Sequence, residues 1–242
     1  EGESMSNSDN QKIDWHARAN ALISAGIDGR AFINGQRVDA ISQLRFPCIS
    51  PIDGREIAQV ARCDAADIDV AVRAARAAFE DRRWAGKSPA QRKKILLQFA
   101  DLIAEHKEEL ALLETLDMGK PIRYSLSVDV LSTANCLRWY AEAIDKIYDE
   151  IAPTSEQALA LITREPVGVV AAIVPWNYPL IMAAWKLAPA LAAGNSVVLK
   201  PSEKSSLSAL RLAELALEAG LPLGVFHVVP GLGHEAGSAL AL

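Results

Sequence analysis

The chain lacks the cysteine and histidine patterns of several protein classes. Its 242 residues include only three cysteines, Cys48, Cys63 and Cys136, with no C-x-x-C pair and no adjacent histidine. This spacing predicts neither a disulfide framework nor a zinc site, and the four histidines form no spaced cluster for another metal. We therefore expect no metal and a reducing, cytoplasmic location.

Charge of one sign is not concentrated anywhere along the chain. Lys and Arg total 25 against 30 for Asp and Glu, which gives a formal net charge of -5. The basic residues are dispersed, whereas a nucleic-acid-binding surface needs a basic patch that follows the phosphates. Nucleic acid is therefore not an expected partner.

The chain also lacks an uninterrupted apolar run long enough to cross a membrane. The most apolar stretch, 166–194, is broken by three prolines, an asparagine and a lysine: Pro175, Asn177, Pro179, Lys186 and Pro189. Residues 1–10 are polar and lack the apolar segment of a signal peptide. We expect a soluble protein without a membrane partner.

Turn and helix signals organise residues 1–149. The N-G pair in F-I-N-G-Q (32–36) and the D-G pair in S-P-I-D-G (50–54) predict two hairpin turns. Helices are predicted to begin after Asp64 and after Ser88, because both residues can cap a first helical turn. Apolar periodicity predicts further helices over about 105–117 and 125–147.

From Asp149 the pattern changes to strands. Residues 151–154 and 159–164 predict a two-stranded ribbon, which is marginal unless it packs on something else. A β-α-β-α-β pattern follows, with strands at 167–174, 196–200 and 225–229 and helices at 179–193 and 206–219. Strands without polar alternation are buried on both faces, which indicates a parallel sheet.

The expected fold is α/β: a doubly wound, mostly parallel, Rossmann-like sheet with a helical N-terminal region and a protruding ribbon. We divide the chain into N-terminal strands and helices (1–149), the ribbon (150–165) and a β-α-β-α-β core (166–242). We expect the helix over 206–219 to be capped by Ser205 or Ser206. The strand at 225–229 is expected to pair with strands that come later in the full-length protein. Without them the sheet would be incomplete, and its apolar edge would be uncovered.

Ligands of open parallel sheets bind at the carboxyl ends of the strands. K-P-S-E (200–203) follows the second strand, and its Lys200 and Glu203 suit a ribose, because the carboxylate accepts hydrogen bonds from both hydroxyls while the ammonium donates. A carboxylate would repel a 2′-phosphate, so this pair favours NAD over NADP. The alternative is that Ser202 caps the next helix and Glu203 lies in its first turn.

G-L-G-H-E-A-G (231–237) follows the third strand. Its third glycine comes one residue too late for the G-x-G-x-x-G dinucleotide fingerprint. Gly233 and Gly237 still allow a flat group to approach the backbone, and a packing role for this turn is the alternative.

V-P-W-N-Y-P (174–179) follows the first strand and holds Asn177 between two prolines. A fixed amide donor at a developing oxyanion is worth about 2.7–4 kcal/mol of transition-state stabilisation. Alternatively, Trp176 is a core aromatic and Asn177 forms an Asx-turn. Lys186 stands out on an apolar helix, although a snorkelling lysine would look the same.

Together these motifs resemble the NAD(P)-dependent aldehyde dehydrogenases over essentially the whole chain. The matching stretches are E-T-L-D-M-G-K-P (114–121), W-Y-A-E-A-I-D-K-I-Y (139–148), V-P-W-N-Y-P (174–179), W-K (185–186), A-P-A-L-A-A-G-N (188–195), K-P-S-E (200–203) and G-L-G-H-E-A-G (231–237). The second stretch and F-I-N-G-Q look most like the γ-glutamyl-aminobutyraldehyde and aminoaldehyde branch.

In that family a cysteine thiolate attacks the aldehyde, hydride passes to the nicotinamide, and a glutamate activates water. The resemblance implies that Asn177 donates to the substrate oxyanion and that Lys186 takes part in charge relay. Its implied coenzyme contacts are Ile173, Pro175, Trp176, Asn177, Lys200, Ser202, Glu203, Gly233 and Gly237. The ribbon matches the family's oligomerisation hairpin, so a homo-oligomer acting on a small-molecule aldehyde is expected.

The match stops short of the family's catalytic groups. The resemblance places the catalytic cysteine, the general-base glutamate and a phosphate-contacting G-S-T turn after Leu242, and no cysteine of this chain fits the nucleophile's motif. We therefore expect the catalytic domain to be absent and the 242-residue chain to be inactive. A non-catalytic nucleotide-binding or subunit-interaction module is the alternative function.

Overall fold

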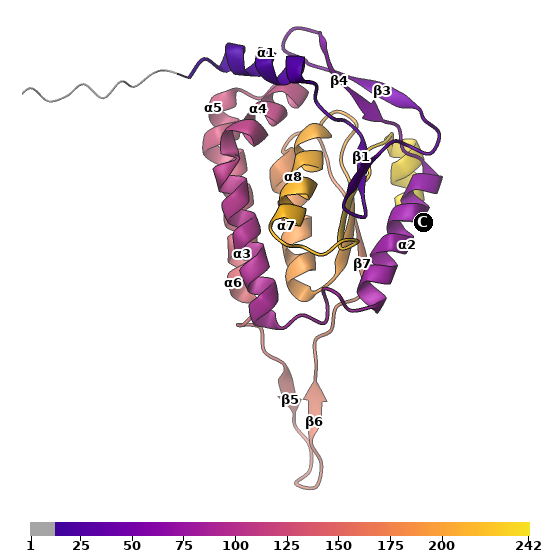
Figure 1. Cartoon of the computed structure of the whole chain (residues 1–242). Coiled ribbons are helices and arrows are strands. Elements are labelled where there is room, and N and C mark those ends of the chain that lie inside the picture. Colours follow the sequence, from indigo (N-terminus) through magenta and orange to yellow (C-terminus); the bar gives the residue numbers. More distant parts are fainter. Residues whose placement is uncertain (1–12) are drawn as a thin grey trace, which may run out of the picture.

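The computed structural model describes residues 13–242 as a body of helices around a five-stranded sheet, from which a two-stranded ribbon projects (Figure 1). The ribbon consists of β5 (Glu150–Ala152) and β6 (Ala160–Ile162), which pair antiparallel as predicted. The signal-peptide prediction for residues 1–10 concerns a segment outside the described residues. Within residues 13–242, no helix is both long enough and apolar enough to cross a membrane.

The sheet has five strands in the order β2-β1-β9-β8-β7. Their bounds are Ala31–Ile33 (β1), Gln36–Val38 (β2), Val169–Ile173 (β7), Ser196–Lys200 (β8) and Phe226–Val228 (β9). The three strands of the predicted β-α-β-α-β unit are parallel, whereas β1 and β2 add an antiparallel hairpin, so the sheet is mixed. The α/β class is thus confirmed, with less parallel character than predicted.

The prediction that the strand over 225–229 ends in an uncovered edge is wrong. β9 pairs with β8 on one side and, through Phe32 and Val228, with β1 on the other. A strand from the N-terminal region therefore supplies the partner that we expected from later sequence. Local patterns predict strands but not which distant strand will pair with them, because pairing is settled by packing.

Helices cover both faces of the sheet, but not in the doubly wound manner that we predicted. Both crossover helices, α7 (Pro179–Ala193) and α8 (Leu207–Glu218), pack on the same face with Val197 and Leu199 of β8. The opposite face is covered by α2 (Ala65–Glu80), which shares a second core cluster with Val198. Figure 1 shows α2 on one side of the strands and α7 and α8 on the other.

Further helices form an outer layer beyond α7 and α8 (Figure 1). They are α3 (Pro89–Glu105), α4 (Lys107–Met118), the short α5 (Ile122–Tyr124) and α6 (Val130–Ala143), with a π-helical turn over Ser125–Asp129. Their apolar faces join those of α7 and α8 in the largest core cluster, whose fully buried members include Leu96, Phe99 and Leu187. This packing makes α7 a central helix of the body.

The predicted helix starts and turns are confirmed where the signal is local. Asp64 and Ser88 cap α2 and α3, each within a capping box. Asn34 and Gly35 have positive φ angles of 51° and 78° in the tight turn between β1 and β2. The D-G turn joins β3 (Arg45–Ile49) to β4 (Glu56–Ala61) as an antiparallel pair.

One helix and one helix cap differ from the sequence predictions. Helix α1 (Trp15–Ala25) was not predicted, and it buries only Ala19, so its apolar periodicity is weak. Helix α8 is not capped by Ser205 or Ser206. The carboxylate of Asp117 accepts a hydrogen bond from the Leu207 backbone N–H at 2.8 Å. This cap comes from a residue ninety positions earlier, so no local pattern announces it.

Candidate functional site at the strand ends

The carboxyl ends of β7, β8 and β9 lie side by side at one edge of the sheet, as predicted. In the parallel register Ile173 is opposite Lys200, and Leu199 is opposite Val228. The backbone N–H of Val174 donates to the carbonyl oxygen of Lys200 at 3.2 Å, which extends the pairing to the end of β7. The segments that follow these strands therefore begin next to one another.

Lys200 and Glu203 form an ion pair at the centre of this edge. Nζ of Lys200 lies 3.1 Å from Oε2 of Glu203, and the Lys200 side chain is 2% exposed whereas that of Glu203 is 36% exposed. Burial raises the pKa of Glu203, but hydrogen bonds from the N–H groups of Glu203 and Gly233 and from Lys200 outweigh it and lower the pKa below its ordinary value. The group is an ionised carboxylate with one side open to a ligand.

The alternative role for Ser202 and Glu203 is wrong in its structural detail. Helix α8 begins at Leu207, so Glu203 does not lie in its first turn. The Ser202 hydroxyl accepts from the Lys204 N–H at 3.2 Å, and the Ser206 hydroxyl donates to the Ser202 carbonyl at 3.0 Å. Ser202 therefore takes part in the turn after β8, which also contains Glu203.

The glycines after β9 divide into two kinds. A methyl group on Gly231 would lie 2.4 Å from the Cys63 carbonyl oxygen, so this glycine is required for packing. A methyl group on Gly233 would have its nearest neighbour, Oε1 of Glu203, at 3.9 Å, and one on Gly237 would lie 3.9 Å from Cδ of Lys200. A methyl group at either position would therefore make only ordinary van der Waals contact with the ion pair; Gly233 is exposed, whereas Gly237 is buried.

The segment after β7 presents its side chains to solvent. Trp176 is 49% exposed, so it is not a core aromatic, and Asn177 is exposed. Ile173, 49% exposed, and the exposed Pro175 flank the same segment. The Asn177 amide is therefore accessible at the edge where the three strands end.

A hollow of about 420 Å³ lies beside this edge. It is lined by Pro47, Cys48, Ile49, Pro51, Asp117, Met118, Trp176, Glu203 and Lys204. Trp176 follows β7 and Glu203 follows β8, so the hollow connects two of the three predicted stretches. Its opposite wall comes from β3 and the end of α4, which sequence analysis did not assign to the site.

Helix α4 contributes two buried carboxylates that the sequence analysis did not single out. Asp117 caps α8, and Glu114 accepts from the Leu180 N–H in the first turn of α7 at 3.3 Å. Burial raises the pKa of Asp117 to about 6 and that of Glu114 to about 8, where the Asp129 carboxylate adds to the effect. The available signal was two acids spaced i, i+3 in the part of α4 (110–118) that has no other charged residue.

Lys186 is not brought to the strand ends. It is exposed on α7, seven residues after Pro179, which corresponds to about 10 Å along the helix axis. The three cysteines do not supply a reactive thiolate. Burial raises the pKa of the Cys48, Cys63 and Cys136 thiols, which favours the protonated form of each.

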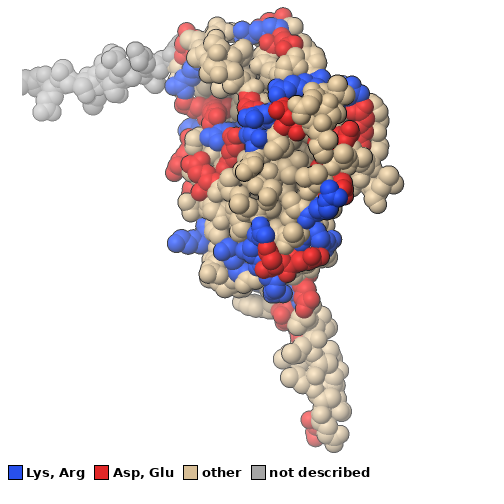
Figure 2. Space-filling view, turned by 45° about the vertical axis from the view of Figure 1, so that its right-hand side comes forward, with Lys and Arg blue, Asp and Glu red and all other residues tan. Residues whose placement is uncertain are grey.

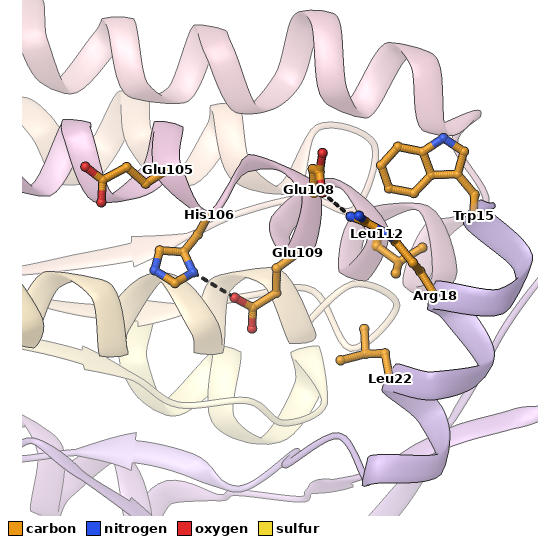
Figure 3. A pocket seen from close by; sticks show the side chains of 8 residues that line it. All are labelled: Trp15, Arg18, Leu22, Glu105, His106, Glu108, Glu109 and Leu112. Atoms are coloured by element: carbon orange, nitrogen blue, oxygen red, sulfur yellow. Dashed lines mark hydrogen bonds and ion pairs between the residues drawn. The ribbon is translucent and has the colours of Figure 1, made fainter. Parts of the chain in front are cut away.

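A separate hollow of about 390 Å³ lies between α1 and α4 (Figure 3). Arg18 pairs there with Glu108, and Nδ1 of His106 lies 3.1 Å from Oε2 of Glu109. Its walls contain no residue from the three strand ends.

In the described part of the chain, no three His, Cys, Asp or Glu side chains group closely enough to hold a metal ion. We therefore place the candidate site at the strand ends.

The chain is similar to proteins of one family. The model of the aldehyde dehydrogenase family matches residues 38–242. An NADP/NAD-dependent aldehyde dehydrogenase of Escherichia coli (strain K12) is 57% identical over 94% of this chain and 45% of its own length. An aminoacetaldehyde dehydrogenase of Pseudomonas aeruginosa is 55% identical over 91% of this chain and 45% of its own length.

A solved structure shows the same arrangement of elements. The aldehyde dehydrogenase KauB from Pseudomonas aeruginosa superposes with a TM-score of 0.93 at 62% sequence identity, over 95% of this chain and 46% of that one. The chain thus spans about half the length of the curated relatives that it matches.

Proposed function

The chain belongs to the aldehyde dehydrogenase family, and from that premise we propose that it is the coenzyme-binding part of an enzyme that oxidises an aldehyde to its carboxylic acid with NAD. The observation that carries this proposal is that Trp176-Asn177, Lys200-Glu203 and the glycines Gly233 and Gly237 lie together at one sheet edge. Such an edge is where dinucleotides bind in α/β proteins.

Lys200 and Glu203 hold the adenosine ribose in this proposal. The ionised Glu203 carboxylate accepts from the ribose hydroxyls, and Lys200 holds that carboxylate in place from its buried side. Gly233 and Gly237 fit an adenine, because each leaves at least 3.9 Å to the nearest side-chain atom around an added Cβ. Ser202 contributes by shaping the loop.

The exposed side chains after β7 serve the reacting end of the coenzyme. Ile173, Pro175 and Trp176 border the dinucleotide, whose nicotinamide, when bound, accepts a hydride from the substrate carbon. Asn177 donates its amide to the oxygen that becomes negative when the aldehyde is attacked. Lys186, which lies further along α7, is proposed to assist proton movement.

The attacking thiolate does not come from Cys48, Cys63 or Cys136 in this proposal. Burial raises the pKa of all three thiols, and Cys48 donates to the Asp117 carboxylate at 3.0 Å, which favours the protonated form. Residues 1–242 alone are therefore expected to bind coenzyme without oxidising aldehydes.

One relative supports the substrate class that we propose. It is described as an aminoacetaldehyde dehydrogenase, and we propose an aminoaldehyde as the substrate of this enzyme. The three cysteines are free, which fits the cytoplasmic location that we propose.

The ribbon supplies the proposed contact with a second copy of the chain. Its exposed apolar side chains include Ile151, Leu159, Leu161 and Ile162, each at least half exposed. Figure 2 shows few charged side chains along most of the ribbon. Short strands with apolar, unpaired edges are suited to pairing with another chain.

A titration with NAD tests the coenzyme site directly. We expect the melting temperature of the 242-residue chain to rise with NAD concentration, because a ligand that binds the folded state stabilises it by mass action. Glu203→Gln should weaken this response about tenfold in apparent Kd, which corresponds to about 1.4 kcal/mol. Glu218→Gln, an exposed position at the far end of α8, is the matched control.

The outcomes separate the possibilities. A concentration-dependent rise that Glu203→Gln weakens and Glu218→Gln preserves supports the coenzyme site. A melting temperature unchanged up to millimolar NAD would contradict it, and an equal loss in both variants would place the binding elsewhere.

A further inference from the structure

The side chains of Glu114, Lys120 and Asp129 meet beneath the turn that carries Asn177. Nζ of Lys120 lies 3.3 Å from Oε1 of Glu114 and forms an ion pair with Oδ2 of Asp129. The side chains of Glu114 and Asp129 are 0% and 1% exposed, and that of Lys120 is 12% exposed. We call Glu114, Lys120 and Asp129 the clamp.

The ammonium group of the clamp also contacts Tyr178. Nζ of Lys120 lies 4.1 Å from the centroid of the Tyr178 ring, within the range of a cation–π interaction. Tyr178 directly follows Asn177 and is itself 46% exposed, so its ring covers the clamp from the solvent side. One flank of Asn177 is thereby fixed to the segment after α4.

Glu114 fixes the other end of the same turn. Its Oε2 accepts from the Leu180 N–H at 3.3 Å, although α7 has no side-chain cap from its own N-cap residue, Tyr178. Pro179 has no N–H to offer at the first helical position. The start of α7 is therefore held by a carboxylate sixty-six residues earlier in the chain.

We propose that Glu114, Lys120 and Asp129 are positioning residues that hold the Asn177–Tyr178 turn in one conformation, so that the Asn177 amide is presented at a fixed place. The inference rests on the proposed function for the role of Asn177, but the clamp and its contacts are independent of that role. Oxyanion stabilisation requires a donor that is already oriented, and groups behind the donor supply that orientation.

The composition of the clamp supports positioning over simple stability. Burying an ion pair costs desolvation, and well-packed apolar side chains of similar volume are often equally stabilising. Charged groups differ from apolar ones in that they accept only a few geometries. Asp129 is the last residue of the π-helical turn over Ser125–Asp129. Such turns are frequent at functional sites.

Backbone order at Asn177 and Tyr178 provides the test. In the ¹⁵N-labelled chain we expect amide order parameters of about 0.8 or more at both residues, the level of rigid backbone. Lys120→Met and Glu114→Ala should lower both values below about 0.6, the flexible range. Lys120→Arg keeps the cation and Glu114→Gln keeps the acceptor oxygen, so both should restore order.

Asp117→Ala is the matched control. Asp117 lies on the same helix as Glu114, is also buried and also caps a helix, but that helix is α8. Its loss should loosen the start of α8 and leave the order of Asn177 and Tyr178 at the wild-type level. A variant that acts through general destabilisation would lower order in both places.

If Lys120→Met does not fold, Tyr178→Leu tests the same contact from its exposed side, because the buried charges stay in place. Asn177 should lose order in Tyr178→Leu and keep it in Tyr178→Phe. Unchanged order at Asn177 in the folded clamp variants, or an equal loss in Asp117→Ala, would overturn the proposal. Titration of the same samples with NAD reports on the coenzyme site separately, so failure of the clamp and failure of the proposed function are distinguishable.

Discussion

The backbone N–H of Asn34 donates a hydrogen bond to Nδ1 of His227 at 3.1 Å. Because Nδ1 accepts, the ring proton is on Nε2, which donates to the Gly224 carbonyl at 3.0 Å. The imidazole thus joins the turn between β1 and β2 to the loop before β9 while it is neutral. Burial lowers the pKa of His227 to about 4 from 6.5.

The first prediction is a loss of stability in acid. The unfolded chain binds a proton at His227 more readily than the folded chain, so stability present above pH 6.5 is lost as the pH falls toward 4. The loss between pH 7 and pH 4 should be about 3 kcal/mol. Urea unfolding at several pH values measures it, and His227→Asn should have the shallower acid slope; parallel slopes would argue against this assignment.

The second prediction concerns Glu114 at higher pH. Burial and the nearby Asp129 carboxylate raise its pKa to about 8 from 4.5, so the folded chain holds this proton more tightly than the unfolded chain. Its contribution to stability is fully present below pH 4.5 and is lost as the pH rises through 8. The wild type should lose on the order of 1 kcal/mol per pH unit more than Glu114→Gln between pH 6 and pH 8. Chemical unfolding at both pH values compares them, and identical pH profiles would refute the prediction.

The third prediction concerns coenzyme selectivity. The Glu203 carboxylate, whose pKa is lowered by hydrogen bonds and by Lys200, repels a 2′-phosphate. Glu203→Ser removes that charge, so binding of NADP relative to NAD should improve by about tenfold or more, equivalent to about 1.4 kcal/mol. Calorimetric titration with each dinucleotide measures the ratio. A ratio unaffected by Glu203→Ser would show that selectivity is set elsewhere.

The fourth prediction contrasts two neighbouring glycines. An added Cβ at Gly231 would lie 2.4 Å from the Cys63 carbonyl, whereas one at Gly233 meets nothing closer than 3.9 Å. Gly231→Ala should therefore destabilise the fold by about 1–3 kcal/mol, the typical cost of overpacking. Gly233→Ala should fold with nearly unchanged stability but bind NAD more weakly. Thermal unfolding and NAD titration distinguish the two, and equal stability losses would contradict the packing role.

The fifth prediction concerns the ribbon. Leu161 is 61% exposed on β6, where an apolar side chain is available to a second chain. Leu161→Arg should lower the mass measured by light scattering without changing the secondary structure of the monomer. Gln157→Arg, in the loop between the two strands, is the matched control and should leave the mass unchanged. A wild-type chain that is monomeric at all concentrations would rule out this contact.

Much of the fold could be predicted because its signals are local. Asp64 and Ser88 predict helix starts because each forms a capping box with the residue three positions later. The N-G pair predicts a tight turn because both residues tolerate a positive φ. The apolar runs of β7 and β8 predict buried parallel strands, and the rule on strand ends then predicts where a ligand binds. The candidate site was found by this route.

The predictions failed where a contact joins distant segments. The cap of α8 comes from Asp117, and the partner of β9 comes from Phe32 in the N-terminal hairpin. Neither residue has a local pattern that names its partner. The same reason explains why Glu114 was passed over, although it holds the start of α7.

The sequence by itself therefore determined most of the elements, the shared position of the carboxyl ends of β7, β8 and β9, and the residue types at those ends, because periodicity and turn chemistry act over a few residues. Only the tertiary structure decided that both crossover helices, α7 and α8, pack on the same face of the sheet. It also decided that Glu114 and Asp117 of α4 accept hydrogen bonds from the first turns of α7 and α8. Those choices depend on the packing of surfaces far apart in the chain, where a buried polar group must find whichever partner the fold places nearby.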